Sequence, residues 1–498
     1  MIDPDARVST RYPTLYEINT RVWLQRLSAE AGRPVTLTDI DDATLDGFAR
    51  RGFDWIWLLG VWRTGLASRA VSRSDAGWRA EFRETLPDLS DEDIAGSCFA
   101  VAAYEVDEAL GGAEALAAFR TRLAARGLRL MLDFVGNHTA LDHPWTRSHP
   151  EYYVAGTEEA LAAAPANWCR IDTGRGPRIL AHGRDPNYPG WADTLQLDYA
   201  NSALQAAQVA VLSAIARQCD GVRCDMAMLL LPDVFRRTWG TSAEPFWPKA
   251  IAAARQVHPG FAFLAEAYWD LEWTLQQQGF DWCYDKRLYD RLVHEDAGAL
   301  RAHLAADPAY QDRLARFLEN HDEARAAAAF PWPRHRAAAI VAFLSPGLRF
   351  FYEGQFEGAR VHVPMHLRRG PVEPRDAAVA AFYERLLRVM RGGGFRDGAW
   401  SALAPRSAWD GNPTWQDFVA CLWRTPDGGW RVVVVNFSDH QAQCRLSLAD
   451  AGLPDCPFRL VDLMGDEVYE RDGHEMREPG LYIDLGAWRY NVFRLDPL

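Results

Sequence analysis

Short apolar runs recur up to residue 352 and alternate with longer amphipathic segments. Runs of this length that are rich in aromatic and aliphatic side chains are typical of buried strands. The eight runs are residues 15–18, 55–59, 128–133, 221–225, 261–266, 280–284, 317–320 and 348–352. Segments rich in Ala and Leu lie between several of them, at 113–125, 203–217 and 337–343. This alternation predicts a parallel sheet, and eight such units predict a closed (β/α)8 TIM barrel.

Two parts of the chain break this pattern. Residues 140–196, after the third run, are rich in Pro, Gly, Trp and His and show no clear helical period. They are predicted to form a small domain inserted after strand three. Beyond about residue 395, strand-like runs are separated by turn signals such as Pro-Asp-Gly-Gly at 426–429. That texture predicts a carboxy-terminal antiparallel β-sandwich domain. The predicted organisation is a barrel of residues 1–139 and 197–395, an inserted domain at 140–196 and a β-sandwich at 396–498.

Charge and composition exclude several kinds of partner. The formal net charge of −13 argues against nucleic acid and against an anionic membrane surface, since both are bound by basic faces. No apolar stretch reaches the ~18 residues of a membrane-spanning helix. Residues 1–13 lack the basic and apolar regions of a signal peptide. The 8 cysteines form no CxxC pair, which predicts buried free thiols rather than disulfides or a zinc site. A cytoplasmic location is therefore predicted.

Polar side chains stand at the carboxyl ends of four predicted strands. In a barrel these ends meet on the face where active sites lie. A single strand-end Asp is usually a helix cap or a loop hydrogen bonder. Several converging ionisable groups are costly to bury unless they are paired and used. The pattern predicts an active site formed by Asp133 with Asn137 and His138, by Arg223 with Asp225, by Glu266, and by the Asn-His-Asp segment at 320–322.

Four motifs contain these residues. They are DFVGNH (133–138), GVRCD (221–225), FLAEAYW (263–269) and ENHDEAR (319–325). In order and context they resemble the four short motifs of the α-amylase family, glycoside hydrolase family 13. Residues 195–198 loosely match a fifth motif. Each motif alone is a weak signal, but four in order on barrel strands are specific. The resemblance implies a retaining α-glycosidase or transglycosylase that works through a covalent glycosyl-enzyme intermediate.

The resemblance also implies roles for three carboxylates. Asp225 would be the nucleophile, Glu266 the general acid/base, and Asp322 a third carboxylate that binds and distorts the sugar. Retaining glycosidases need two carboxyl groups ~5–5.5 Å apart, which neighbouring strands can supply. Arg223 lies two residues before Asp225, on the same side of its strand, so its charge is expected to keep the nucleophile ionised. Apolar neighbours are expected to raise the pKa of Glu266.

Further residues are candidates for binding the substrate. Arg325 is predicted either to hold the sugar and Asp322 or to be an outward-facing charge at a helix start. Glu319 and Glu323 have no predicted role beyond that of loop charges. The remaining candidates are the sugar-binding pair that the resemblance implies, His138 and His321, and the aromatic residues Phe99, Tyr104, Trp62 and Trp269.

One departure from the family pattern affects the predicted function. α-Glucan hydrolases often carry a Lys-His pair three and four positions after the nucleophile, and this chain has Met228 and Leu229, which predicts a more apolar acceptor side. Some family members build a calcium site from the Asn of the first motif and the inserted domain. Here Asn137 and Asp198 are the candidate ligands of a structural calcium, although calcium prefers about six to eight oxygens. No cofactor is expected to be required.

Three functions are compatible with these observations. The leading one is a retaining hydrolase of α-glucosides or α-gluco-oligosaccharides. The second is a transglycosylase or isomerase that passes the glycosyl group to a sugar or another acceptor. The third is a catalytically silent carbohydrate-binding protein, against which the three intact carboxylates argue. The partner in each case is a small-molecule carbohydrate, while the sugar, the linkage and the oligomeric state are not determined by the sequence.

Overall fold

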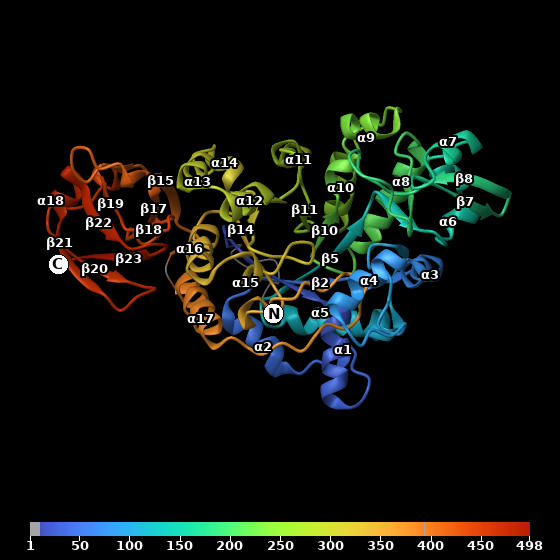
Figure 1. The fold of residues 1–498 in the computed structure, drawn as a ribbon, viewed down its shortest axis with the longest axis horizontal. Helices are drawn as coiled ribbons and strands as arrows, with labels where there is room; N and C mark the ends of the chain where they lie inside the picture. The colour runs from blue at the N-terminus through green and yellow to red at the C-terminus, as the bar shows by residue number, and fades with distance from the viewer. Residues whose placement is uncertain (1–9, 393) are drawn as a thin grey trace.

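Eight parallel strands close into a barrel in the computed structural model, which describes residues 10–392 and 394–498 (Figure 1). Each strand pairs with its sequence neighbour in the barrel, and the first closes against the last. The predicted barrel is confirmed. Its strands are β1 (Thr14–Asn19), β2 (Trp55–Leu59), β5 (Arg129–Val135), β10 (Gly221–Asp225), β11 (Ala262–Ala265), β12 (Trp282–Tyr284), β13 (Leu314–Arg316) and β14 (Leu348–Tyr352).

The seventh strand lies earlier in the sequence than predicted. Strand β13 ends at Arg316, so Phe317 and Leu318 follow the strand instead of forming it. Both side chains are nevertheless buried. The ring of Phe317 packs against Tyr284 and Phe350, with centroids 5.4 and 5.7 Å away. The apolar run therefore marks burial against the aromatic interior of the barrel rather than strand pairing.

Helices surround the barrel. The segments predicted at 113–125 and 203–217 are helical, and 337–343 is the second half of a longer helix that is buried on nearly every side. The segment 337–343 is therefore not amphipathic as predicted, because all of its residues are buried. The helices after the barrel strands are α1 (Thr20–Ala31), α2 (Asp42–Arg51), α5 (Gly112–Ala124), α8 (Ser202–Ile215), α9 (Pro232–Trp239), α10 (Trp247–Val257), α11 (Glu272–Gln278), α12 (Lys286–His294), α13 (Ala297–Leu304), α14 (Pro308–Gln311), α15 (Ala326–Ala329), α16 (Trp332–Phe343) and α17 (Ala377–Gly392).

Two excursions interrupt the barrel. The first follows β2, was not predicted, and contains β3 (Trp62–Thr64), α3 (Leu66–Ser74), α4 (Ala76–Thr85) and β4 (Val101–Val106). The second follows β5 and contains β6 (His138–Ala140), α6 (Trp145–Ser148), α7 (Glu158–Ala163), β7 (Trp168–Thr173), β8 (Gly176–Ala181) and β9 (Thr194–Gln196). Strands β6 and β9 pair at its base. Helix α7 spans only 6 residues, which is too short to produce the helical period sought in the sequence.

The carboxy-terminal region forms two antiparallel sheets around a shared apolar core. Figure 1 shows it at one end of the molecule, with the second excursion at the other. The larger sheet has the order β15-β17-β18-β23-β20-β21 and the smaller one β16-β19-β22. Their bounds are β15 (Ala399–Leu403), β16 (Pro405–Arg406), β17 (Phe418–Arg424), β18 (Trp430–Asn436), β19 (Ala442–Leu446), β20 (Pro457–Asp462), β21 (Val468–Asp472), β22 (Leu481–Leu485) and β23 (Tyr490–Pro497), with the single turn α18 (Gly473–Glu475).

The cysteines and the helices bear on two predictions from composition. All 8 cysteines are free, and six of them are buried. Within residues 10–392 and 394–498, no helix is both long and apolar enough to cross a membrane.

Trp423 joins the carboxy-terminal sheet to the barrel. Its side chain is fully buried, and its indole N–H donates to the carbonyl of Leu344 at 2.9 Å. The ring meets Tyr12 and Phe395 edge-on at 5.4 and 5.7 Å, and the Arg349 guanidinium lies 5.7 Å from its centroid. One continuous apolar core therefore runs from the barrel into strands β17 and β18.

Replacing this side chain should destabilise the protein. We expect Trp423→Ala to lower the free energy of unfolding by about 3–5 kcal/mol, because it removes a buried aromatic ring and leaves a cavity. Urea denaturation followed by circular dichroism measures the change. The control is Trp409→Ala, which removes a ring that is 54% exposed and should change stability by less than ~0.5 kcal/mol. Equal losses of stability in the two variants would contradict the role of Trp423 in joining the carboxy-terminal sheet to the barrel.

Candidate active site

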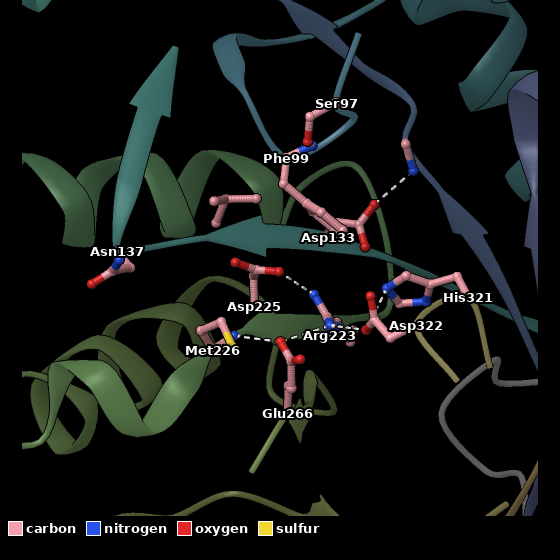
Figure 2. A network of polar contacts seen from close by, with 12 residues as sticks. Ser97, Phe99, Asp133, Asn137, Arg223, Asp225, Met226, Glu266, His321 and Asp322 are labelled. Atoms are coloured by element: carbon pink, nitrogen blue, oxygen red, sulfur yellow. Dashed lines mark hydrogen bonds and ion pairs between the residues drawn. The ribbon is translucent and has the colours of Figure 1, made fainter. Parts of the chain in front are cut away.

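Arg223 lies at the carboxyl end of the barrel, in the middle of the predicted site (Figure 2). Strand β10 is extended, so Arg223 and Asp225 project from the same side of it. The strand register places Arg223 level with Asp133 on β5 and with Leu264 on β11. The Arg223 side chain is completely buried. A buried guanidinium requires negative partners, and the neighbouring strand ends supply them.

Three carboxylates surround this guanidinium. Nη1 of Arg223 lies 2.6 Å from Oδ1 of Asp225, and Nη2 lies 2.7 Å from Oε2 of Glu266. The same Nη2 is 3.7 Å from Oδ2 of Asp322. The structure thus brings together the three carboxylates and the arginine that the motifs single out.

Glu266 is held by backbone and side-chain donors as well. The backbone N–H of Met226 donates to its Oε2 at 2.6 Å, and the hydroxyl of Tyr268 donates to its Oε1 at 2.8 Å. Met226 has φ 42°, a left-handed conformation that side chains other than Gly adopt only at a cost. The strained residue aims its N–H at the carboxylate, so both oxygens of Glu266 have a fixed orientation.

The environment of Glu266 favours its protonated form. Burial is the main cause, and it raises the pKa of Glu266 to about 7. The nearby charges of Asp225 and Asp322 act in the same direction, while Arg223 opposes them. A carboxyl group with this pKa can both give and accept a proton near neutral pH.

Asp322 belongs to a chain of alternating charges. Nδ1 of His321 pairs with Oε1 of Glu17 at 2.5 Å, and Nε2 of His321 lies 3.1 Å from Oδ2 of Asp322. Burial alone would lower the pKa of His321, but the two carboxylates raise it well above its ordinary value. Burial alone would raise the pKa of Asp322, but the imidazolium brings it down to about 2. Asp322 is also 25% exposed at its side chain, more than the other two carboxylates.

Phe99 and His138 adjoin the cluster. The ring of Phe99 lies 5.1 Å from the Arg223 guanidinium carbon and 5.4 Å from the His321 ring. His138 packs against Trp191 at 5.2 Å, and burial lowers its pKa. A neutral imidazole at this place can donate to or accept from a hydroxyl group.

Asp133 and Tyr104 organise the end of strand β5. The carboxylate of Asp133 accepts from the indole N–H of Trp57 at 3.0 Å and from the backbone N–H of Gly60 at 2.8 Å, and burial raises its pKa to about 6. The Tyr104 hydroxyl bonds both the carbonyl and the N–H of Val135, each at 2.9 Å. Tyr104 therefore bridges the backbone where the strand ends, instead of offering its hydroxyl to a sugar.

Two of the candidate stacking residues lie outside the cluster. The ring of Trp269 faces the guanidinium of Arg237 on α9, 5.7 Å away. Trp62 is fully buried and donates its indole N–H to the carbonyl of Asp133 at 2.8 Å. Its ring is covered by protein and cannot stack on a sugar in this conformation.

Arg325 matches neither prediction made for it. It is only 5% exposed, which excludes an outward-facing charge. Its guanidinium pairs with Glu319 at 3.2 Å, donates to the carbonyl of Glu353 at 2.7 Å and lies over the Tyr352 ring. Glu319 is likewise not a loop charge, because it is buried and accepts the N–H of Ala326 at 2.5 Å. The Arg325–Glu319 pair therefore stabilises the segment 319–326, which contains Asp322.

Two neighbouring residues also differ from prediction. Met228 and Leu229 are 0% and 3% exposed, so they belong to the core and do not make the acceptor side apolar. A short turn, residues 227–230, directs them inward. Glu323 pairs with Lys286, with 3.3 Å between Oε1 and Nζ.

The predicted calcium ligands, Asn137 and Asp198, each accept a hydrogen bond within the protein. The Asn137 side-chain oxygen accepts from the amide of Gln196 at 3.0 Å, and Asp198 accepts the backbone N–H of Ala200 at 3.0 Å. Across the described part of the chain, no three His, Cys, Asp or Glu side chains form a group that could hold a metal ion. Dependence on calcium stays a prediction.

Sequence reasoning missed three members of the site. Glu17 stabilises His321, the Tyr284 hydroxyl lies 3.3 Å from Nε of Arg223, and Tyr268 bonds Glu266. One signal was available for Glu17. It is the single acidic residue of a strand whose every position is buried, and a buried charge implies a partner.

Comparison with known proteins finds a similarity in the part of the chain that carries Asp225 and Glu266. The model of the alpha-amylase catalytic domain matches residues 99–272, which contain two of the three carboxylates of the site. The match covers about a third of the chain, and this part is similar to the catalytic domain of α-amylases. The chain has no match among curated proteins.

Solved structures share the fold of nearly the whole chain. A maltogenic alpha-amylase from Thermotoga neapolitana has a TM-score of 0.69 at 16% identity, with 98% of this chain and 99% of that one covered. An alpha-amylase from Lactobacillus plantarum has a TM-score of 0.67 at 20% identity, with 97% of this chain and 99% of that one covered. The alpha-amylase from Geobacillus thermoleovorans complexed with acarbose has a TM-score of 0.67 at 16% identity, with 98% of this chain and 99% of that one covered.

The charge chain predicts how His321 titrates. We expect His321 to remain protonated well above neutral pH, and Glu17→Gln to lower its pKa by about one pH unit or more, because the variant removes one of two adjacent negative charges. NMR of the labelled imidazole measures this. The control is Glu323→Gln, which makes the same change at a carboxylate paired with Lys286. Titration of His321 near its ordinary value in the unmodified protein would contradict the arrangement.

Proposed function

We propose that this chain is a retaining α-glycoside hydrolase that acts on α-glucosides or α-gluco-oligosaccharides. One observation carries the proposal. Asp225 and Glu266 contact neighbouring nitrogens of one buried guanidinium, at 2.6 and 2.7 Å. The first is ion-paired, and burial brings the pKa of the second to about 7. Two carboxyl groups at close range, one serving as nucleophile and the other as acid, are what a retaining mechanism requires.

The first step of the mechanism divides the work between these residues. The free oxygen of Asp225, Oδ2, attacks the anomeric carbon while Glu266 donates its proton to the departing glycosidic oxygen. The Tyr268 hydroxyl, which donates to the carboxylate at 2.8 Å, can instead accept from the acid form, so the orientation holds in both protonation states. In the second step the Glu266 carboxylate removes a proton from water, which attacks the glycosyl-enzyme and frees Asp225.

Arg223 supports both steps electrostatically. Negative charge leaves Asp225 when the glycosyl bond forms and appears on Glu266 when its proton departs. Because the guanidinium contacts both groups, the charge moves from one of its nitrogens to the other without losing its counter-ion. A fixed charge of this kind requires no reorganisation during the reaction.

Asp322 has the properties of a sugar-binding carboxylate. Its pKa of about 2 keeps it ionised, and its side chain is the most exposed of the three. An ionised carboxylate accepts strong hydrogen bonds from sugar hydroxyls. His321 holds it from behind, so Asp322 is positioned before substrate arrives.

The related structures and the buried core favour hydrolysis of α-linked glucans. Those structures include a maltogenic amylase, an amylase complexed with acarbose and a cyclic alpha-maltosyl-(1→6)-maltose hydrolase from Arthrobacter globiformis. Met228 and Leu229 lie in the core, so they do not provide an apolar acceptor site for transfer to a sugar. Product analysis with maltose, sucrose, trehalose and maltotetraose distinguishes water from a sugar as the acceptor.

Removal of the nucleophile tests the assignment. We expect Asp225→Asn to reduce kcat on p-nitrophenyl α-glucoside by about a thousandfold or more, because a neutral amide cannot form the glycosyl-enzyme. The control is Asp233→Asn on α9, which changes an exposed residue of the same type and should retain activity. Full activity of Asp225→Asn would exclude the proposed mechanism. No activity of the unmodified protein on any α-glucoside would favour a silent binding protein.

The pH profile tests the role of Glu266. The acid must be protonated, so kcat/KM should fall with increasing pH above about 7, the pKa of Glu266. Tyr268→Phe removes a donor that stabilises the carboxylate, and this raises the pKa of Glu266 and shifts the alkaline limb to higher pH. Tyr188→Phe, at a residue that is 69% exposed, is the matched control. An alkaline limb that does not move in Tyr268→Phe would argue against Glu266 as the acid.

A further inference from the structure

A cavity lies apart from the carboxylate cluster. It has a volume of about 810 Å³ and is formed by helix α1, by the excursion after β2, by the turn after β4 and by the loop after β14. None of the residues that line it belongs to the site around Arg223. Four arginines face it, and we call it the arginine cavity after them: Arg21, Arg69, Arg73 and Arg368.

Three of these arginines are anchored by consecutive backbone carbonyls in the segment 94–96. Arg73 donates to the first carbonyl at 3.2 Å, Arg69 to the second at 3.0 Å, and Arg21 to the third at 2.8 Å. Each of these bonds uses one N–H of a group that has five. Arg21 also donates to Oγ1 of Thr64 at 3.3 Å. A carbonyl or hydroxyl orients a guanidinium but does not neutralise it, so positive charge remains beside the cavity.

The acidic residues of the lining do not balance this charge. Glu92 is mostly in solvent and approaches Arg368 no closer than 3.8 Å, and Asp107 caps the turn that follows β4. Burial lowers the pKa of Arg69, and the neighbouring arginines lower it further. Among the described residues, Nε of Arg368 is buried without a hydrogen-bond partner.

The residue after Arg368 is an arginine with a structural role. Arg369 binds Asp88 and Asp93 together, with distances of 2.8 to 3.2 Å. Arg368 differs from Arg369 in this respect. The same excursion carries carboxylates, but they do not neutralise the arginines of the cavity. The remaining cations retain the capacity to bind an anion from solution.

We propose that the arginine cavity binds a small organic phosphate monoester. Four guanidinium groups against two carboxylates leave a net charge of +2, which matches a phosphate monoester of about −1.5 to −2 at pH 7 better than a single carboxylate. Guanidinium groups bind phosphate through paired N–H donors. The volume suits a ligand of this size, since small-molecule sites span about 300–1,000 Å³.

The rest of the lining suits the organic part of such a ligand. Leu24, Val35 and Leu110 provide apolar surface, while Gln25 and Ser28 provide hydrogen-bonding groups. A hydroxylated carbon skeleton can contact both. This inference does not depend on the proposed hydrolase activity, because it concerns residues outside the carboxylate cluster.

Isothermal titration calorimetry with glucose 6-phosphate on the full chain tests the proposal. We expect binding that weakens as salt concentration rises. The double variant Arg73→Gln with Arg368→Gln should weaken it by about tenfold or more, because it removes charge-assisted hydrogen bonds. The matched control is Arg63→Gln, an arginine of the same excursion that pairs with Glu105 at 3.1 Å and does not line the cavity. Unchanged affinity in the double variant would overturn the proposal.

Three further titrations identify the chemistry that is recognised. Glucose should show no binding that is sensitive to the double variant, while inorganic phosphate and gluconate should each bind more weakly than glucose 6-phosphate. Gluconate binding as tightly as the phosphate ester would overturn the assignment to phosphate, and phosphate alone binding as tightly would overturn the organic part. Circular dichroism checks folding. If the double variant does not fold, Arg368→Gln replaces it, since its Nε makes no hydrogen bond within the described residues.

Discussion

The buried guanidinium of Arg223 is the constraint on which the active site depends. A cation placed inside a barrel is stable only when anions compensate it, and here the compensating groups are the same carboxylates that the chemistry needs. The Arg223 guanidinium holds Asp225 and Glu266 at fixed positions, and it lies 3.7 Å from Asp322. Its faces are covered by three aromatic rings 5.1 to 5.7 Å away, those of Trp57, Phe99 and Tyr284. Ion pairs therefore position the carboxylates in advance, and the packed aromatic rings cover the guanidinium that holds them.

Charges of alternating sign extend this principle across the barrel. Glu17 on the first strand binds His321, which binds Asp322, which approaches Arg223. Each charge satisfies its neighbours, so a change at one position alters the protonation of the others. The network explains why two acids so close together differ, with the pKa of Asp322 near 2 and that of Glu266 near 7. One is paired with an imidazolium, and the other is dominated by burial.

The arginine cavity follows the opposite electrostatic pattern, and the two regions share one segment of chain. Carbonyls in residues 94–96 anchor three of its arginines, and Phe99, three residues further on, lies against Arg223. At the catalytic cluster every charge has a partner within the protein. In the cavity the cations outnumber the carboxylates, and an anion from solution supplies what the chain does not.

The sequence by itself determined the barrel, the two additional domains and the three carboxylates, because apolar period and motif order are local properties of the chain. Only the tertiary structure decided what surrounds them. Glu17 meets His321 across 304 positions, and no spacing along one strand reveals such a contact. Met228 and Leu229 read as acceptor-side residues but face the core, and Arg325 is buried against Glu319 instead of Asp322. The reason is physical: period tells which side chains share a face, whereas partners of a buried charge are chosen by packing between distant segments.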